Sequence, residues 1–308
     1  MDIIQVITKE LNVEKWQVEA AVKLIDEGCT IPFISRYRKE ATGSLNDEQL
    51  RTLHERLTYL RNLEEKKNQV LGSIEEQGKL TAELKKQILD AQTLVVVEDL
   101  YRPFRPKRRT RAIIAKEKGL EPLANIIMLQ MTDKPIEEEA QDFVSEDKGV
   151  ESVADAINGA KDIIAEHISD EADYRIYLRK LTMDRGSVAS TAKKPEESSV
   201  YEMYYEFEEP IKKLAGHRVL ALNRGEKEKI LTVKVNAPEE EAMGWLQKQV
   251  ITKENPITKP ILREVVEDSY KRLIAPAIER EIRNDLTEKA EDGAIHVFGK
   301  NLEQLLMQ

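Results

Sequence analysis

Apolar residues that recur every three or four positions constrain this chain more than any other feature. The clearest run lies between residues 45 and 78, where leucine or isoleucine stands at positions 50, 53, 57, 60, 71 and 74. This spacing puts the apolar side chains on one face of an α-helix, which would be about 45 Å long at 1.5 Å per residue. Glu64 and Lys67 interrupt that face. The interruption favours packing against other helices of the same chain over a self-sufficient coiled coil.

Helical spacing also predicts most of the other elements. It covers residues 2–11, 14–27, 81–91, 152–168 and 260–308, and Pro276 is expected to kink or divide the last of these. After Gly186 the helical period stops, and Leu231, Val233 and Val235 alternate as in a half-buried strand. We therefore predict a mainly α fold, an extended multi-helix assembly with a few short strands near 186–192 and 229–236.

At 308 residues the chain is longer than one compact core usually supports, so we expect two or more packed units. The loss of helical period at Gly186 suggests one boundary. We predict a helical region over residues 1–185, and a mixed segment that leads into a long helical region over residues 186–308.

Composition and charge limit the classes of function. A single cysteine, Cys29, cannot form an internal disulfide, and no secretory signal or long apolar stretch is visible, so we expect a cytoplasmic protein without a membrane span. The net charge of −9 argues against indiscriminate coating of nucleic acid. It leaves room for a local cationic site, because exposed charges are screened over roughly 8 Å at physiological salt.

The sequence contains no recognisable catalytic or metal-binding motif. Its thirteen glycines are never closer than six residues apart, which excludes glycine-rich phosphate loops, and its four histidines are at least fifty residues apart. We predict that the chain is not an enzyme and uses neither a cofactor nor a metal ion.

The stretch YRPFRPKRRTR (101–111) is the strongest candidate for a binding function. Between residues 102 and 118 there are eight basic residues and one acidic residue, whereas residues 133–173 hold fourteen acidic residues and three lysines. Pro103 and Pro106 favour an extended backbone, which could display cations along a phosphate chain while Tyr101 and Phe104 stack on bases. Alternatively, the arginines bind acidic helices of the same chain and the aromatic residues are core anchors. The candidate phosphate contacts are Arg102, Arg105, Lys107, Arg108, Arg109 and Arg111.

A second cationic segment, IPFISRYRKEATGSL (31–45), poses the same choice. Arg36, Arg38 and Lys39 flank Tyr37 shortly before a predicted turn at Gly43. These cations could bind a phosphate, or they could fasten the segment to the long helix at Glu48 or Glu55.

Two segments have the pattern of helix-turn-helix units, residues 7–25 with Asn12 at the turn and residues 111–129 with Gly119 at the turn. Neither second helix carries a stripe of the Arg, Asn and Gln residues that read base edges, so ordinary helix packing is the favoured interpretation of both.

The chain resembles the Tex family of bacterial transcription accessory proteins. The resemblance is carried, in order, by IPFISRYRKEATGSL (31–45), QLRTLHERLTYLRNLEEKK (49–67), IEEQGKLT (74–81), EDLYRPFRPKRRTRAIIAKEKGLEPLA (98–124), ALNRGEKEKIL (221–231) and RLIAPAIEREIRNDLTEKAE (272–291). Ser35 and Ser44 stand where the family often has Ala and Gly.

The resemblance implies a helical N-terminal region with helix-turn-helix elements, related in architecture to a eukaryotic transcription elongation factor and histone chaperone. Family members continue with an RNase-H-like domain, helix-hairpin-helix repeats and an OB-fold RNA-binding domain. We therefore expect this chain to stop before the RNase-H-like domain.

Two functional hypotheses follow. In the first, the chain is a non-catalytic helical scaffold of a transcription accessory factor and contributes to association with RNA or DNA, helped by domains outside it. In the second, the acidic 133–173 surface docks a protein partner such as the transcription machinery, without direct nucleic-acid contact.

Overall fold

The computed structural model describes residues 2–307, which fold into two compact units that divide between Phe104 and Arg105. Helices dominate both units, so the predicted mainly α fold is confirmed. The predicted boundary after residue 185 lies inside the second unit, where a helix ends and the first strand begins. As a domain boundary it stays a prediction.

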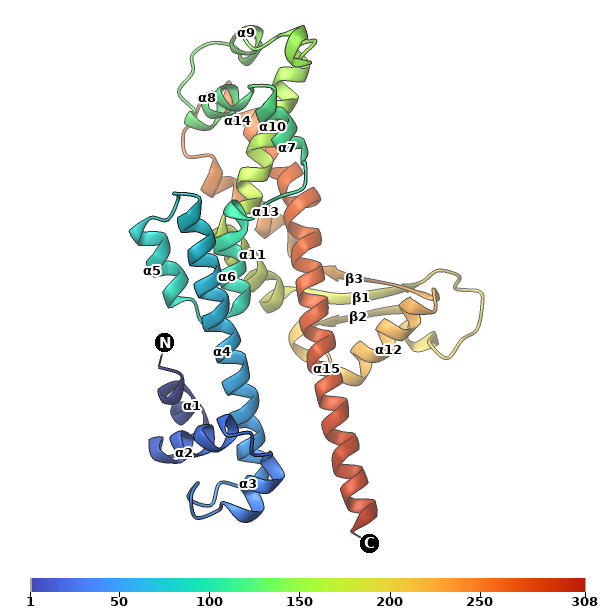
Figure 1. Cartoon of the computed structure of the whole chain (residues 1–308). Coiled ribbons are helices and arrows are strands. Elements are labelled where there is room, and N and C mark those ends of the chain that lie inside the picture. The colour runs from blue at the N-terminus through green and yellow to red at the C-terminus, as the bar shows by residue number, and fades with distance from the viewer. Residues whose placement is uncertain (1, 308) are drawn as a thin grey trace. The chain divides into compact units, whose positions relative to one another are not determined.

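The first unit is built around one long helix, α4, which confirms the 30-residue element expected from the leucine spacing (Figure 1). Asn46 caps its start, since its side chain accepts a hydrogen bond from the Gln49 backbone N–H at 2.8 Å. The helices of this unit are α1 (Ile3–Leu11), α2 (Lys15–Asp26), α3 (Ile31–Tyr37), α4 (Asp47–Glu76), α5 (Ala82–Asp90) and α6 (Leu94–Tyr101), followed by a 3-10 turn (Arg102–Phe104).

The apolar face of α4 forms the core of the first unit with its neighbours. Its leucines at positions 50, 53, 57, 60 and 63 are all buried. Lys67, which interrupts the face in the sequence, is fully buried too, and its ammonium donates to Glu64 Oε1 at 3.0 Å and to the Leu89 carbonyl at 2.8 Å. Groups of α4 and α5 therefore satisfy the buried ammonium. This agrees with the prediction that α4 packs against other helices of the same chain.

The second unit contains nine α-helices and a small sheet within the described residues. Its helices are α7 (Arg111–Glu117), α8 (Glu121–Leu129), α9 (Ile136–Gln141), α10 (Val153–Asp170), α11 (Ala172–Arg185), α12 (Gly216–Lys227), α13 (Glu239–Val250), α14 (Thr258–Asp268) and α15 (Ala275–Leu306). The largest core cluster of the unit gathers side chains from α7, α8, α10 and α14, among others. Within the part of the chain that the structure describes, no helix is long and apolar enough to cross a membrane.

Three antiparallel strands form the sheet, in the order β2-β1-β3. The bounds are β1 (Ser187–Ala192), β2 (Glu206–Pro210) and β3 (Leu231–Asn236), so the two predicted strands are confirmed and β2 is an addition. Figure 1 shows α12 and α15 beside the strands. Gly225 of α12 permits this packing, because a Cβ there would lie 2.6 Å from the Leu231 side chain of β3.

The last helical segment is divided where the proline predicts. A π-helical turn (Ser269–Ile274) joins α14 to α15, and Pro276 is the second residue of α15. Because proline has no backbone N–H, the regular hydrogen-bond ladder cannot pass through this point unchanged.

The turns inside the two predicted helix pairs are also where the sequence places them. Asn12 between α1 and α2 has φ of +50°, and Gly119 between α7 and α8 has φ of +82°. This left-handed geometry ends each first helix and reverses the chain. Ordinary helix packing, the favoured interpretation of both pairs, and the helix-turn-helix alternative both stay predictions.

Candidate nucleic-acid interface

The segment from α3 to the start of α4 presents cations and aromatic rings to solvent. Ile34 of α3 is buried in the core and Ile31 packs against it, whereas most of the other side chains of α3 are exposed. Tyr37 is 69% exposed and Phe33 is 38% exposed, with their ring centroids 5.5 Å apart. The exposed cations of the segment are Arg36, Arg38 and Lys39.

This segment is held in place by residues of α2. The Gln17 side-chain amide donates to the Thr42 carbonyl at 3.2 Å and to the Gly43 carbonyl at 3.0 Å. Gly43 has φ of +61°, and a Cβ at this position would lie 2.5 Å from the Trp16 ring. The loop after α3 is therefore fixed to the scaffold, which lowers the entropy that a ligand would have to remove on binding.

The three cations of the segment are not engaged in ion pairs with other described residues. Within residues 2–307, Arg36, Arg38 and Lys39 form no salt bridge, and the Arg38 guanidinium lies 5.5 Å from the centroid of the Phe33 ring. The alternative in which they fasten the segment to Glu48 or Glu55 is thus not what the structure contains. Their charge stays available at the surface, beside aromatic faces that stack on bases elsewhere in nucleic-acid recognition.

The basic stretch 101–111 does not run as one extended strand. Tyr101 is the last residue of α6, a 3-10 turn covers 102–104, and Arg111 opens α7, so only residues 105–110 lie outside helices. The Tyr101 and Ser73 hydroxyl groups hydrogen-bond at 2.9 Å, and the Phe104 carbonyl accepts from the Gln77 amide at 3.0 Å. Both aromatic residues pack against the core of the first unit. They act as core anchors and not as exposed stacking platforms.

The six predicted cations of this stretch are divided between different surroundings. Lys107 pairs with carboxylates of α10, and Arg109 pairs with Glu117, its Nη2 lying 2.7 Å from Oε2. Arg102 belongs to the first unit and is engaged in an interaction of its own. Arg105 and Arg108 are exposed and form no ion pair among the residues that the structure describes.

Arg111 lies at a hollow of about 380 Å³ whose lining includes Asp162. Burial raises the pKa of the Asp162 carboxyl above its usual value, while Arg272 and Arg111 oppose that rise by their positive charge. Arg272 Nη2 lies 3.3 Å from Asp162 and 2.6 Å from Asp268. Arg111 is therefore part of a mixed-charge cluster and is not isolated in solvent.

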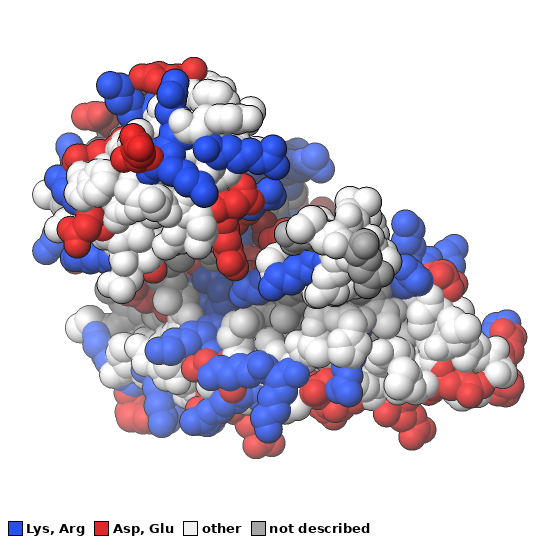
Figure 2. Space-filling view, turned by 90° about the horizontal axis from the view of Figure 1, so that it is seen from below, with Lys and Arg blue, Asp and Glu red and all other residues white. Residues whose placement is uncertain are grey.

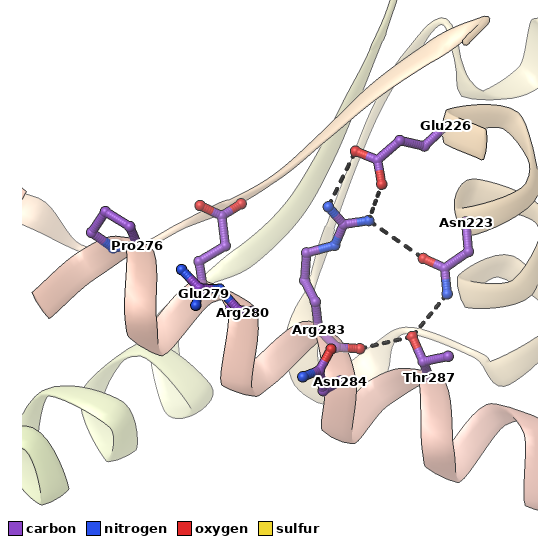
Figure 3. Close-up of a pocket in the computed structure, with 8 residues that line it drawn as sticks. All are labelled: Asn223, Glu226, Pro276, Glu279, Arg280, Arg283, Asn284 and Thr287. Carbon is purple, nitrogen blue, oxygen red and sulfur yellow. Dashed lines mark hydrogen bonds and ion pairs between the residues drawn. The ribbon is translucent and has the colours of Figure 1, made fainter. Parts of the chain in front are cut away.

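A second hollow, of about 500 Å³, lies between α12 and α15 (Figure 3). Arg283 reaches from α15 to the Glu226 carboxylate on α12, and the Asn223 amide donates to Thr287 Oγ1 at 2.8 Å. The hydrogen bonds of Arg283 lower the pKa of Glu226. Since its main charges are paired with each other, this hollow joins two helices and has little unbalanced charge to attract an anion.

Figure 2 shows one face of the molecule, on which Lys and Arg side chains are interspersed with Asp and Glu. Positive charge on that face is distributed over several groups. This distribution agrees with a net charge of −9 and means that any anion site is local.

Among the described residues, no cluster of three or more His, Cys, Asp and Glu side chains is arranged to hold a metal ion.

Sequence reasoning missed the carboxylates that pair with Lys107. Asp162, Glu166 and Asp170 recur every four residues on α10, and this spacing was the signal that could have revealed a negative row on one helix face. Lys107 lies about sixty positions from Glu166 and Asp170, and Arg272 lies 110 positions from Asp162, so no local pattern reports these pairs.

The architecture is that of a mainly α protein built from paired helices around two cores, with one small antiparallel sheet. Sequence comparison defines the family. The model of the Tex-like protein N-terminal domain matches residues 1–75, and the model of the Tex central region-like family matches residues 131–298. The chain therefore belongs to the Tex family, as its sequence motifs predict.

Relatives match over nearly the whole chain. It is 49% identical to the uncharacterized protein YdcI of Bacillus subtilis, over 99% of this chain and 43% of that protein. It is 37% identical to the transcriptional accessory protein Tex of Neisseria gonorrhoeae, over 100% of this chain and 41% of that protein. It is 33% identical to the human S1 RNA-binding domain-containing protein 1, over 99% of this chain and 32% of that protein. The chain thus spans less than half the length of these relatives.

Proposed function

We propose that this chain contributes to nucleic-acid association in a transcription accessory protein, as a non-catalytic helical scaffold that presents cations to RNA or DNA. The relatives named as a transcriptional accessory protein and as an S1 RNA-binding domain protein support a transcription-related role. The proposal concerns the part of such a protein that this chain covers.

One observation carries the proposal. Arg36, Arg38 and Lys39 are exposed, lack carboxylate partners within residues 2–307, and lie on a fixed segment beside the exposed Tyr37 ring. Cations without internal partners can release counterions from a phosphate backbone, and an adjacent aromatic face can stack on an unpaired base. Arg105 and Arg108 of the second unit are the further candidates, because they too are exposed and unpaired among the described residues.

The direct test is a fluorescence-polarisation titration with single-stranded RNA and with duplex DNA at about 50 mM and about 200 mM salt. Replacing Arg36, Arg38 and Lys39 together by alanine is expected to weaken binding about tenfold or more at the lower salt, because about three phosphate contacts are lost. The matched control replaces three exposed lysines of the same unit that form no ion pair among the described residues, Lys79, Lys85 and Lys86. Equal weakening by both triple variants would reduce the effect to net charge and refute a defined site.

A second candidate function is supported by the acidic surface around α9. In the first half of the 133–173 stretch the carboxylates are mainly exposed, including those of Glu137, Glu138, Asp142 and Asp147. Such a surface fits docking to a basic face of the transcription machinery. If the wild-type chain binds neither polymer at low salt but binds purified RNA polymerase, and Glu137→Lys with Glu138→Lys abolishes that binding, the docking function replaces the first.

A further inference from the structure

One face of α10 carries a regular row of carboxylates, which we call the acidic row: Asp162, Glu166 and Asp170. The members are four residues apart, so they recur at intervals of about 6 Å along the helix axis. Their side chains are only 27%, 18% and 14% exposed, respectively. The row is therefore largely buried, unlike the exposed carboxylates around α9.

One cation in contact with this row, Lys107, comes from the basic stretch. Lys107 Nζ lies 3.2 Å from Glu166 Oε1 and also pairs with Asp170, and the Lys107 side chain is 21% exposed. Two carboxylates on successive helical turns thus enclose one ammonium group. At the other end of the row, Arg111 and Arg272 act on Asp162 by their positive charge.

The loop that carries Lys107 presents its other cations differently. Arg105 and Arg108 are exposed and lack ion pairs within the described residues, so the loop has inward and outward cations at nearly adjacent positions. Residues 105–110 form no helix or strand. Because no regular backbone ladder holds the loop, exchanging the carboxylates around Lys107 for other anions requires little rearrangement of secondary structure.

A phosphodiester backbone is also a row of regularly repeating negative charges, so its phosphate groups can form ion pairs with Lys107 in place of the carboxylates of the acidic row. We infer that the acidic row of α10 is a built-in competitor that occupies Lys107 in the unbound chain and gives it up when a nucleic-acid backbone engages Arg105 and Arg108. This inference rests on the proposed nucleic-acid association. It predicts that the loop favours polymers over single phosphate groups, since only a polymer contacts the outward cations and Lys107 together.

The test removes the competitor while keeping the cation. Glu166→Gln is expected to tighten binding of single-stranded RNA by about threefold to tenfold at low salt, because a partly buried carboxylate no longer holds Lys107. Asp170→Asn, which removes the other carboxylate, is expected to act in the same direction. Glu137→Gln is the control, since it removes an exposed charge of the same unit that forms no ion pair among the described residues.

The decisive measurement combines Glu166→Gln with Lys107→Ala. If the acidic row acts through Lys107, Glu166→Gln no longer raises the affinity for RNA once Lys107 is alanine. If the gain in affinity comes only from the reduced negative charge of the chain, it is still present in the double variant. Thermal melting of each variant shows whether the fold is retained. Should Glu166→Gln fail to fold, the same cycle with Asp170→Asn decides the question.

The possible results separate this inference from the proposed function. If the wild-type chain binds RNA, weakens on Arg108→Glu, and is unchanged by Glu166→Gln and Asp170→Asn, the competitor is refuted and the nucleic-acid function stands. If neither the wild-type chain nor the two carboxylate variants bind either polymer at low salt, both proposals are refuted. Tightening by Glu137→Gln equal to that by Glu166→Gln also refutes the competitor.

Discussion

Gln130 is expected to be an important polar residue for the stability of the second unit. It is 4% exposed, ends α8 with φ of +54°, and bridges to the end of α13. Its amide nitrogen donates to the Val250 carbonyl at 2.9 Å, and its amide oxygen accepts from the Thr252 and Lys253 backbone N–H groups, each at 3.1 Å. One side chain therefore satisfies three backbone groups of a segment 120 positions away in sequence.

Gln130→Ala removes all three hydrogen bonds. At a net 0.5–1.5 kcal/mol for each bond, the free energy of unfolding of the second unit should fall by about 1.5–4.5 kcal/mol. Gln130→Gly separates two contributions, because glycine adopts the positive φ without strain but makes no side-chain hydrogen bond. We expect glycine to be almost as destabilising as alanine, since the lost bonds dominate.

Urea unfolding followed by Trp245 fluorescence measures this effect. Trp245 lies in α13 and stacks on Tyr177 with ring centroids 3.9 Å apart, so its emission reports the packing of the helix that Gln130 secures. The other tryptophan, Trp16, belongs to the first unit and is replaced by phenylalanine in every sample. A loss below about 0.5 kcal/mol in the alanine variant, comparable to an ordinary surface substitution, would refute the reasoning.

Three further changes have defined outcomes. Gly43→Ala should lower the free energy of unfolding of the first unit by about 1–3 kcal/mol, because φ is +61° and the new methyl group meets Trp16; urea unfolding followed by Trp16 emission checks this, and an unchanged midpoint contradicts it. Glu281→Gln should lower the free energy of unfolding of the second unit by about 3–5 kcal/mol, since it removes the carboxylate that lies 2.6 Å from the fully buried Arg175. A thermal or urea melt measures this, and a decrease below about 1 kcal/mol would contradict it. The pKa of Glu226 is lowered in the folded state, so its contribution to stability is present above the unfolded pKa of about 4.3 and is lost as pH falls through the folded pKa. In Glu226→Gln, the free energy of unfolding should therefore fall less steeply as the pH is lowered. Identical profiles of stability against pH in the two proteins would contradict this.

The helices were predictable because their information is local. In α4 the leucines at 50, 53, 57 and 60 repeat at the helical period, and all are buried as that period predicts. The alternation at Leu231, Val233 and Val235 identified β3 for the same reason. Strand β2 was missed because it is a short strand at the sheet edge with the sequence EFEEP, in which Phe207 is the only apolar residue before the final proline.

The state of each cation was not predictable, because ion pairing depends on tertiary contacts. Lys107 and Arg108 are adjacent in sequence, yet Lys107 contacts a carboxylate 63 positions later while Arg108 lies in solvent. Composition counts both as equal members of a basic stretch. The segment at 31–39 seemed the weaker candidate from sequence, but its three cations form no ion pair within residues 2–307.

This distinction between paired and unpaired cations predicts the salt dependence of binding. If six cations of the basic stretch each neutralised one duplex phosphate, the logarithm of the binding constant would fall with the logarithm of salt concentration with a slope of about −5. Among the residues that it describes, the structure leaves Arg36, Arg38 and Lys39 without ion pairs in the first unit and Arg105 and Arg108 in the second. At −0.9 per contact, the slope is expected to be about −2.7 if only the first group acts and about −4.5 if both act, or about −5.4 if Lys107 is released and joins them. Arg105→Ala with Arg108→Ala should then reduce the magnitude of the slope by about 2 only if the second group acts. A slope near zero at measurable affinity would mean that phosphate contacts do not drive binding, which would remove the electrostatic basis of the proposed function.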